Sequence, residues 1–271
     1  MVRSIPPHMN HAEFLEYIVE ENRFTIAVVF PVVGAILLLL SANGILPDLL
    51  SFNPWLLLFG VFVMRLPLLA GIAPIWSKQS ALAILILSLY SYGVEYIGIM
   101  TGYPYGSFTY GVDLGPTVGG IPFALPLLFI PLVLNAYLLV LLLLPIARRK
   151  RLVRIATTVF LVLTTDFVLD PGAVSLGFWS YAAPGLHGVP VSNYLGWTLS
   201  SLVAAISLDY AFENDKLYDC LDKTPFMLDD MVSFVILWGG INAYYYNWTA
   251  VIAAIILGLL LIRADRFNTP W

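Results

Sequence analysis

The sequence predicts an all-α fold: a polytopic bundle of about eight transmembrane helices in one integral membrane domain, residues 1–271. Of its residues, 60% are hydrophobic and only 11% are charged, whereas soluble domains carry roughly 25% charged residues. Apolar runs of about 20 residues, the length that crosses a bilayer core, recur along the whole chain. Helices are expected because lipid leaves no backbone group unpaired, and no alternating pattern indicates a barrel.

The predicted elements follow in chain order. A polar, acidic leader, residues 1–23, lacks the basic segment and cleavage site of a signal peptide. The predicted spans are Phe24–Ala42, Trp55–Ile75, Ala81–Met100, Ile121–Leu144, Leu152–Leu169, Tyr194–Phe212, Met231–Tyr246 and Trp248–Ile262. The last two are short and are separated only by the sequence YNW, so seven spans with one re-entrant segment is the alternative.

The orientation is predicted by the sequence ARRKRLVR, Ala147–Arg154, the only basic cluster in the chain. Lys and Arg in short loops mark the cytoplasmic side of the cell membrane. With eight spans, both termini are then cytoplasmic, and two long loops, Thr101–Gly120 and Pro171–Ser192, lie together on the outer face. Both loops are rich in Gly, Pro and aromatic residues, which fix turns and favour the membrane–water interface.

Five ionisable residues lie in the apolar spans or at their ends: Arg65, Glu95, Asp166, Asp170 and Asp209. A charge near mid-membrane costs about 2.5–3.5 kcal/mol, so such residues are usually functional or paired. Glu95 and Asp166 are expected at similar depth, and Asp166 and Asp170, four positions apart, project from one helix face. We therefore expect three carboxyl groups to converge below the outer loops, where a protonated and an ionised group can share acid–base chemistry.

Each charged residue also has a structural interpretation. Asp170 precedes a Pro-Gly pair and could cap a turn. Asp166 could form an ion pair with Arg65, and Glu95 could accept a hydrogen bond from a neighbouring tyrosine. Asp209 lies near the cytoplasmic end of its span and is expected to be interfacial.

The sequence lacks the usual ligand sets for metals and cofactors. Histidine occurs only at His8, His11 and His187, and the one cysteine is Cys220, so a di-iron histidine cluster and a multi-cysteine site are excluded. No glycine-rich dinucleotide motif follows a strand, and no serine–histidine elbow is present. The sequence predicts chemistry without metal or cofactor, and no nucleic-acid partner.

Three ordered blocks resemble a known family: GVEYIGIMTGYPYGSFTYGVDLGP, DFVLDPGAVSLGFWSY and HGVPVSNYLGW. They are similar to the signature blocks of membrane carotenoid hydratases, whose archaeal branch comprises the bisanhydrobacterioruberin hydratases of bacterioruberin synthesis. The resemblance covers residues 95–197, the expected catalytic core, and the flanking spans match only in hydropathy. The family favours Phe where this chain has Tyr105 and Tyr194, and an aromatic residue at His187, which leaves the exact substrate open.

The resemblance implies a lyase that adds water to the terminal isoprenoid C=C of an acyclic carotenoid and needs no cofactor. Its implied partners are the lipid-soluble carotenoid, water and membrane lipids, with other carotenoid-pathway enzymes as further candidates. The residue chemistry agrees, because a carboxylic acid can protonate the alkene and a second carboxylate can deprotonate water. We expect Glu95 and Asp166 to form the acid–base pair, with Asp170 in support; which group is the acid stays open.

Aromatic residues flank these carboxyl groups, and their faces stabilise cations. The candidate substrate-binding residues are Tyr96, Tyr103, Tyr105, Tyr110, Trp179, Tyr181, Asn193 and Trp197.

Two other functions fit part of the sequence. The D-x-x-x-D spacing of Asp166 and Asp170 resembles half of the magnesium-binding motif of membrane prenyltransferases, but the outer loops lack basic residues for a diphosphate. Intramembrane carboxylates also mark proton-coupled transporters, which predict inverted repeats that are not evident here.

Overall fold

The computed structural model describes residues 10–264 and 266, so residues 1–9 of the predicted leader lie outside the described part. Most described residues are helical, and the strands are only two or three residues long. The elements are α1 (His11–Glu21), η1 (Thr25–Val29), α2 (Phe30–Ala42), α3 (Pro54–Ile72), η2 (Ala73–Ile75), α4 (Lys78–Thr101), β1 (Phe108–Tyr110), β2 (Thr117–Val118), β3 (Ile121–Pro122), α5 (Leu125–Leu143), α6 (Pro145–Arg149), α7 (Arg151–Leu176), β4 (Trp179–Tyr181), α8 (Val191–Ala211), α9 (Asn214–Lys223), η3 (Pro225–Leu228), α10 (Asp229–Tyr244) and α11 (Trp248–Arg263).

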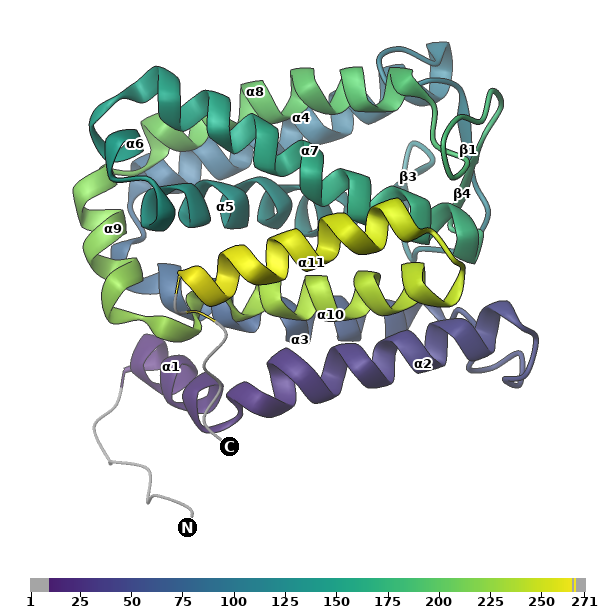
Figure 1. The fold of residues 1–271 in the computed structure, drawn as a ribbon, viewed down its shortest axis with the longest axis horizontal. Helices are drawn as coiled ribbons and strands as arrows, with labels where there is room; N and C mark the ends of the chain where they lie inside the picture. Colours follow the sequence, from purple (N-terminus) through teal and green to yellow (C-terminus); the bar gives the residue numbers. More distant parts are fainter. Residues whose placement is uncertain (1–9, 265, 267–271) are drawn as a thin grey trace.

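Seven helical segments of the described chain are long and apolar enough to cross a membrane: Thr25–Ala42, Pro54–Ile75, Lys78–Thr101, Leu125–Leu143, Arg151–Leu176, Val191–Ala211 and Pro225–Tyr244. They confirm the predicted helical, multi-pass architecture. The eighth predicted span corresponds to α11, which has 16 residues and lies along α10 (Figure 1). The exact number of spans and their orientation stay predictions.

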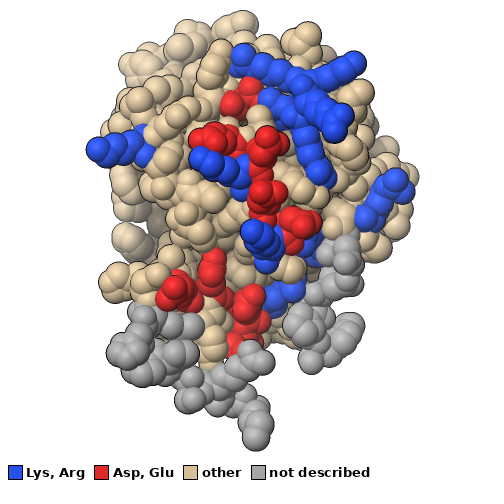
Figure 2. Space-filling view, turned by 90° about the vertical axis from the view of Figure 1, so that its left-hand side faces the viewer, with Lys and Arg blue, Asp and Glu red and all other residues tan. Residues whose placement is uncertain are grey.

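The long helices run along one axis, so the molecule has two distinct ends (Figure 1). One end, which we call the charged end, carries α1, α6 and α9. The other, the loop end, carries β1, β4 and the connection between α2 and α3. Basic and acidic side chains gather on the face of the charged end (Figure 2). There Asp209 forms ion pairs with Arg154 and Arg151, as expected for a carboxylate near the end of its span.

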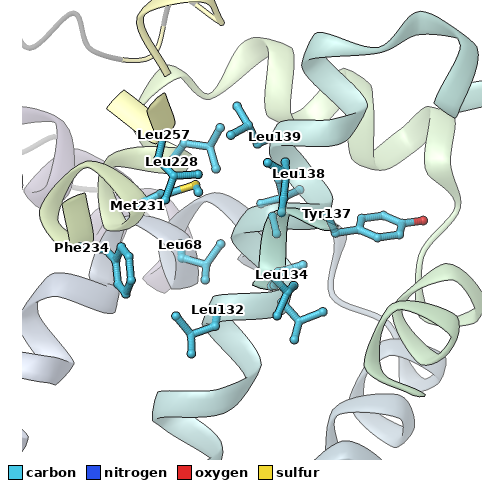
Figure 3. Packing of buried hydrophobic residues seen from close by; sticks show 14 of the residues in the cluster. Leu68, Leu132, Leu134, Tyr137, Leu138, Leu139, Leu228, Met231, Phe234 and Leu257 are labelled. Atoms are coloured by element: carbon cyan, nitrogen blue, oxygen red, sulfur yellow. The ribbon is translucent and has the colours of Figure 1, made fainter. Parts of the chain in front are cut away.

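Helix α5 forms the centre of the bundle because it is apolar on all sides. Its residues from Phe129 to Leu141 are all buried, and a helix without a polar face has no stable place at a water interface. Figure 3 shows its leucines packed against side chains of α3, α10 and α11, among them Leu68, Met231 and Leu257. The other helices are therefore arranged around α5, with their remaining apolar faces outward.

Helix α7 is longer than predicted. The sequence predicts that this span ends at Leu169 and that an outer loop begins at Pro171, but the helix continues to Leu176. A proline inside a helix leaves the carbonyl four residues earlier without its donor, and such breaks are tolerated in membranes where neighbours supply polar contacts. The carbonyl that Pro171 leaves free is that of Phe167, and beside it the side-chain amides of Asn242 and Asn247 donate to the Val168 and Pro171 carbonyls over 2.7 and 3.3 Å. The helix ends instead at Gly177, whose φ of 79° favours glycine.

The two loops that the sequence predicts on the outer face are joined by a short antiparallel ladder that the sequence did not reveal. Strand β1 pairs with β4, so that Phe108 lies opposite Tyr181 and Tyr110 lies opposite Trp179. Because alternate residues of a strand share a face, these four aromatic side chains lie on one side of the ladder. The ladder lies at the loop end, next to α4 and α7 (Figure 1).

Candidate active site

A cavity of about 420 Å³ lies within the bundle. Its walls come from α2, α3, α4, α5, α7, α8 and α10 together with the loops at the loop end, and most of the lining side chains are apolar. Three charged side chains line it among the described residues: Arg65, Glu95 and Asp170. Two of the three predicted catalytic carboxyl groups therefore reach one apolar chamber.

The pair on α7 is held by a shared amide. Asn193 Nδ2 of α8 donates to Asp170 Oδ2 over 2.5 Å and to Asp166 Oδ2 over 3.2 Å. The Tyr181 hydroxyl of β4 also donates to Asp170 Oδ2, over 3.0 Å. Asp166 is fully buried behind Asp170, and its Oδ1 has no hydrogen-bond partner among the described residues. The two aspartates thus form one unit, in which Asp170 faces the cavity and Asp166 stands behind it.

The third carboxyl group belongs to Glu95, in the last two turns of α4. The helix begins at Ser77, whose side chain forms a capping box with Ser80, and ends at Gly102 with φ 75°. Glu95 is 9% exposed and accepts a hydrogen bond from the Tyr110 hydroxyl. The hydrogen bond from a tyrosine that the sequence allowed is therefore confirmed, and its donor is Tyr110.

The β1–β4 ladder supplies a phenol to each side of the site. Tyr110 binds Glu95, and Tyr181 binds Asp170. Burial raises the pKa of both phenols above their usual range, with further contributions from the neighbouring carboxylates. Both hydroxyls therefore keep their protons and act as donors. Phe108 packs between them, with ring centroids 5.6 Å from Tyr110 and 6.0 Å from Tyr181.

A second set of aromatic side chains forms the cavity wall beside α8. Tyr105 is buried, and its hydroxyl lies 2.6 Å from Ser200 Oγ. Its ring and that of Phe129 flank Trp197, at centroid distances of 6.4 and 5.7 Å. A Cβ atom on Gly196 would lie 2.4 Å from the Tyr105 ring, so this glycine permits the close approach of loop and helix.

Of the predicted substrate-binding residues, six line the cavity: Tyr105, Tyr110, Trp179, Tyr181, Asn193 and Trp197. Tyr96 and Tyr103 do not, and both are exposed on the outside of the protein. His187 also lies apart, with its Nε2 2.7 Å from the Thr249 hydroxyl.

Four aromatic residues of the cavity wall were not predicted from the sequence: Phe108, Phe129, Phe178 and Trp238. Of these, only Phe108 could have been found from the sequence. In Phe108-Thr109-Tyr110 aromatic and polar residues alternate, which in a strand places both rings on one side.

Two structural interpretations of the charged residues are wrong. Asp170 does not cap a turn, because it lies inside α7. Arg65 does not pair with Asp166 but forms an ion pair with Asp230, which also accepts from Asn135 Nδ2 over 2.7 Å. Arg65 Nε reaches the Leu127 carbonyl as well, at 3.4 Å. That carbonyl is free because Pro131, four residues later, has no N–H to donate.

No group of three or more His, Cys, Asp and Glu side chains in the described part of the chain is arranged to hold a metal ion. The chemistry that this arrangement offers is proton transfer between carboxyl groups in an apolar chamber.

Comparisons with known proteins show which proteins this chain is similar to. A family model described as carotenoid biosynthesis protein matches residues 52–261, a segment that includes all three carboxyl groups. The chain is 57% identical over 251 residues to the bisanhydrobacterioruberin hydratase of Haloarcula japonica, across 92% of this chain and 86% of that protein. No solved structure matches the chain.

Proposed function

The chain belongs to the carotenoid biosynthesis protein family, and we propose that it is a carotenoid hydratase of the bisanhydrobacterioruberin type. As a lyase, it adds water to the terminal isoprenoid C=C of an acyclic carotenoid and leaves a tertiary alcohol. The single observation that carries this proposal is the 57% identity to a hydratase over most of both chains. The cavity supports it, because an apolar chamber suits an isoprenoid end and its carboxyl groups suit proton transfer.

The reaction begins with protonation of the alkene. The acid O–H bond breaks, and the π electrons of the alkene form a C–H bond at the less substituted carbon, which leaves a tertiary cation. We assign this step to the pair of Asp166 and Asp170. Two buried carboxyl groups that share one amide donor, with no cation bonded to either among the described residues, are best accommodated with one proton between them. Asp170 delivers the proton because it is the member that lines the cavity.

Water completes the reaction. A lone pair of the water oxygen forms the C–O bond to the cation, and a proton of that water passes to a carboxylate. We assign this base to Glu95, which lines the same cavity and is oriented by Tyr110. The faces of Phe108, Trp179 and neighbouring rings lower the energy of the cation. Transfer of a proton back to the aspartate pair restores the starting state, so the net change is alkene plus water to alcohol.

We further propose that α11 is an eighth span and that both termini lie in the cytoplasm, with the protein in the cell membrane. The basic cluster of Arg148, Arg149, Lys150, Arg151 and Arg154 supports this topology, because it lies at the charged end, where α1 also lies and α11 ends (Figures 1 and 2). The loop end, with the β1–β4 ladder, then faces outward. Water enters the site from that side.

The test uses purified protein in liposomes that contain an acyclic carotenoid, without an ion gradient and with a metal chelator. The expected product gains one water at a carotenoid end, as measured by chromatography and mass spectrometry. Addition of five-carbon units from a supplied prenyl diphosphate and Mg²⁺ would identify a prenyltransferase instead. Folded protein that leaves every tested carotenoid unchanged would overturn the hydratase assignment.

A further inference from the structure

The cavity continues beyond the carboxyl groups towards α2 and α3. Its wall on that side includes Gly34 and Leu37 of α2, Leu56 and Gly60 of α3, and Leu50 of the connection between them. We call this part of the wall the α2–α3 opening. All five residues are uncharged and, apart from the glycines, are leucines.

The α2–α3 opening reaches the outer surface of the bundle. Leu37, Leu50 and Leu56 are 44%, 46% and 48% exposed, although they also line the cavity. By contrast, Phe129 and Leu237, which line the inner wall, are 5% and 6% exposed. Contact with the cavity alone therefore does not account for the exposure of the leucines, and these side chains border both the chamber and the outside.

Gly60 keeps this passage wide. No heavy atom lies within 4 Å of the position that a Cβ atom on Gly60 would take. In an apolar transmembrane helix, most positions carry large side chains, which would fill this space. On the opposite helix, a Cβ on Gly34 would meet only the Leu237 side chain, at 3.5 Å.

The two helices that flank the opening are apolar along their exposed faces. Thr25–Ala42 and Pro54–Ile75 are the two flanking spans, and their mean hydropathies are 2.5 and 2.2. Only 28% and 33% of these two segments is buried in the protein, so both present broad apolar faces to lipid. A hydrocarbon chain is expected to partition between these apolar faces, whereas a polar or charged ligand is not.

We propose that the α2–α3 opening is the lateral entrance for the substrate and the binding site for its polyene chain. The terminal C=C then lies beside Glu95 and Asp170 while the chain passes Gly60 into the bilayer. A cavity of about 420 Å³ is of the size that holds a drug-sized ligand, so the remainder of a long carotenoid must lie outside it. This inference rests on the proposed function for the identity of the ligand.

The test fills the opening without touching the carboxyl groups. In Gly60→Phe a ring occupies the passage, and in Gly60→Ala a single methyl group does not. The matched control is Gly93→Phe on α4, because Gly93 is exposed, also has no heavy atom within 4 Å of its Cβ position and does not line the cavity. Thermal unfolding in detergent checks that each variant folds.

Two readouts separate entry from chemistry. The first is hydration of lycopene, a long acyclic polyene, and of myrcene, a short alkene with the same terminal group. The second is the amount of lycopene that stays bound through purification on a Glu95→Gln background, measured by visible absorption. Gly60→Phe is expected to lower lycopene hydration and lycopene retention by about tenfold or more, since an occupied passage cannot also hold the chain. Myrcene hydration falls far less than lycopene hydration, Gly60→Ala loses less of both lycopene signals than Gly60→Phe, and Gly93→Phe behaves as wild type.

The proposal is overturned if Gly60→Phe retains and hydrates lycopene as wild type does, or if it loses myrcene and lycopene hydration equally. A protein that is not a hydratase would give another result, because the wild type would then hydrate neither compound. Lycopene retention would still test the entrance: it is supported if Gly60→Phe loses bound lycopene and Gly93→Phe does not.

Discussion

Glu95→Gln removes the proton-transfer capacity of one carboxyl group and changes little else. Glu95 lines the cavity, is 9% exposed, and has the Tyr110 hydroxyl as its hydrogen-bond donor. A glutamine has the same shape, and its amide oxygen can accept from the same hydroxyl. The variant therefore separates the role of Glu95 in proton transfer from its role in packing.

The expected loss of rate follows from the value of one general base. Such a group contributes roughly 10²–10⁴-fold, which corresponds to about 2.7–5.4 kcal/mol in the activation free energy. The free energy of unfolding changes less, by about 1 kcal/mol, because a hydrogen bond to a charged acceptor is exchanged for one to a neutral acceptor. Tyr110→Phe is the comparison, because it keeps the carboxyl group and removes one hydrogen bond. The activation free energy then rises by about 1 kcal/mol, so the rate falls only about fivefold.

The assay measures initial rates of carotenoid hydration in liposomes, with thermal unfolding of each variant in detergent as the check on folding. The reasoning holds if Glu95→Gln is much slower than Tyr110→Phe at similar stability. It is refuted if folded Glu95→Gln hydrates the carotenoid at the wild-type rate, or if Tyr110→Phe costs more than Glu95→Gln.

Three further predictions concern residues around the site. Asp170→Asn removes the proposed acid at the cavity wall and should slow hydration by roughly 10²–10⁴-fold in the same assay; an unchanged rate would exclude Asp170 from the chemistry. Arg65→Met leaves Asp230 buried without its cation, so we expect a loss of about 3–5 kcal/mol in the free energy of unfolding. The double variant Arg65→Met/Asp230→Leu should recover most of that loss in thermal unfolding, and a double variant less stable than the single one would contradict this. Gly111→Ala places a Cβ atom 2.2 Å from the Gly177 carbonyl oxygen, so the chain must shift beside the ladder. We expect lower activity and a lower Tm, and wild-type values for both would show that the ladder does not depend on this contact.

The membrane architecture was predictable because lipid imposes one rule on every segment. The length of each apolar run and its scarcity of charged residues identified all seven long spans from local sequence alone. Their ends were less predictable. The proline after Asp170 ended the predicted helix, whereas α7 continues to Leu176, beside side-chain amides of Asn242 and Asn247 that donate to the Val168 and Pro171 carbonyls. A local rule cannot include a donor that arrives only when the chain has folded.

The carboxyl groups were predictable for the same reason, since a charge in an apolar run is costly and stands out. The helical repeat also put Asp166 and Asp170 on one face. Their partners were not predictable. Arg65 was a candidate partner for Asp166, but it pairs with Asp230, from a span whose neighbours the sequence does not specify.

The sequence by itself therefore determined that this chain spans a membrane, that it carries buried carboxyl groups and which family it resembles, because each of these depends on composition or on residues close in the chain. Tertiary structure alone decided that Asp170 rather than Asp166 lines the cavity and that Asn193 joins the two. It also decided that the β1–β4 ladder brings Tyr110 and Tyr181 to opposite carboxyl groups. These contacts join residues from different helices and loops, and their geometry is fixed by how apolar helices pack around α5.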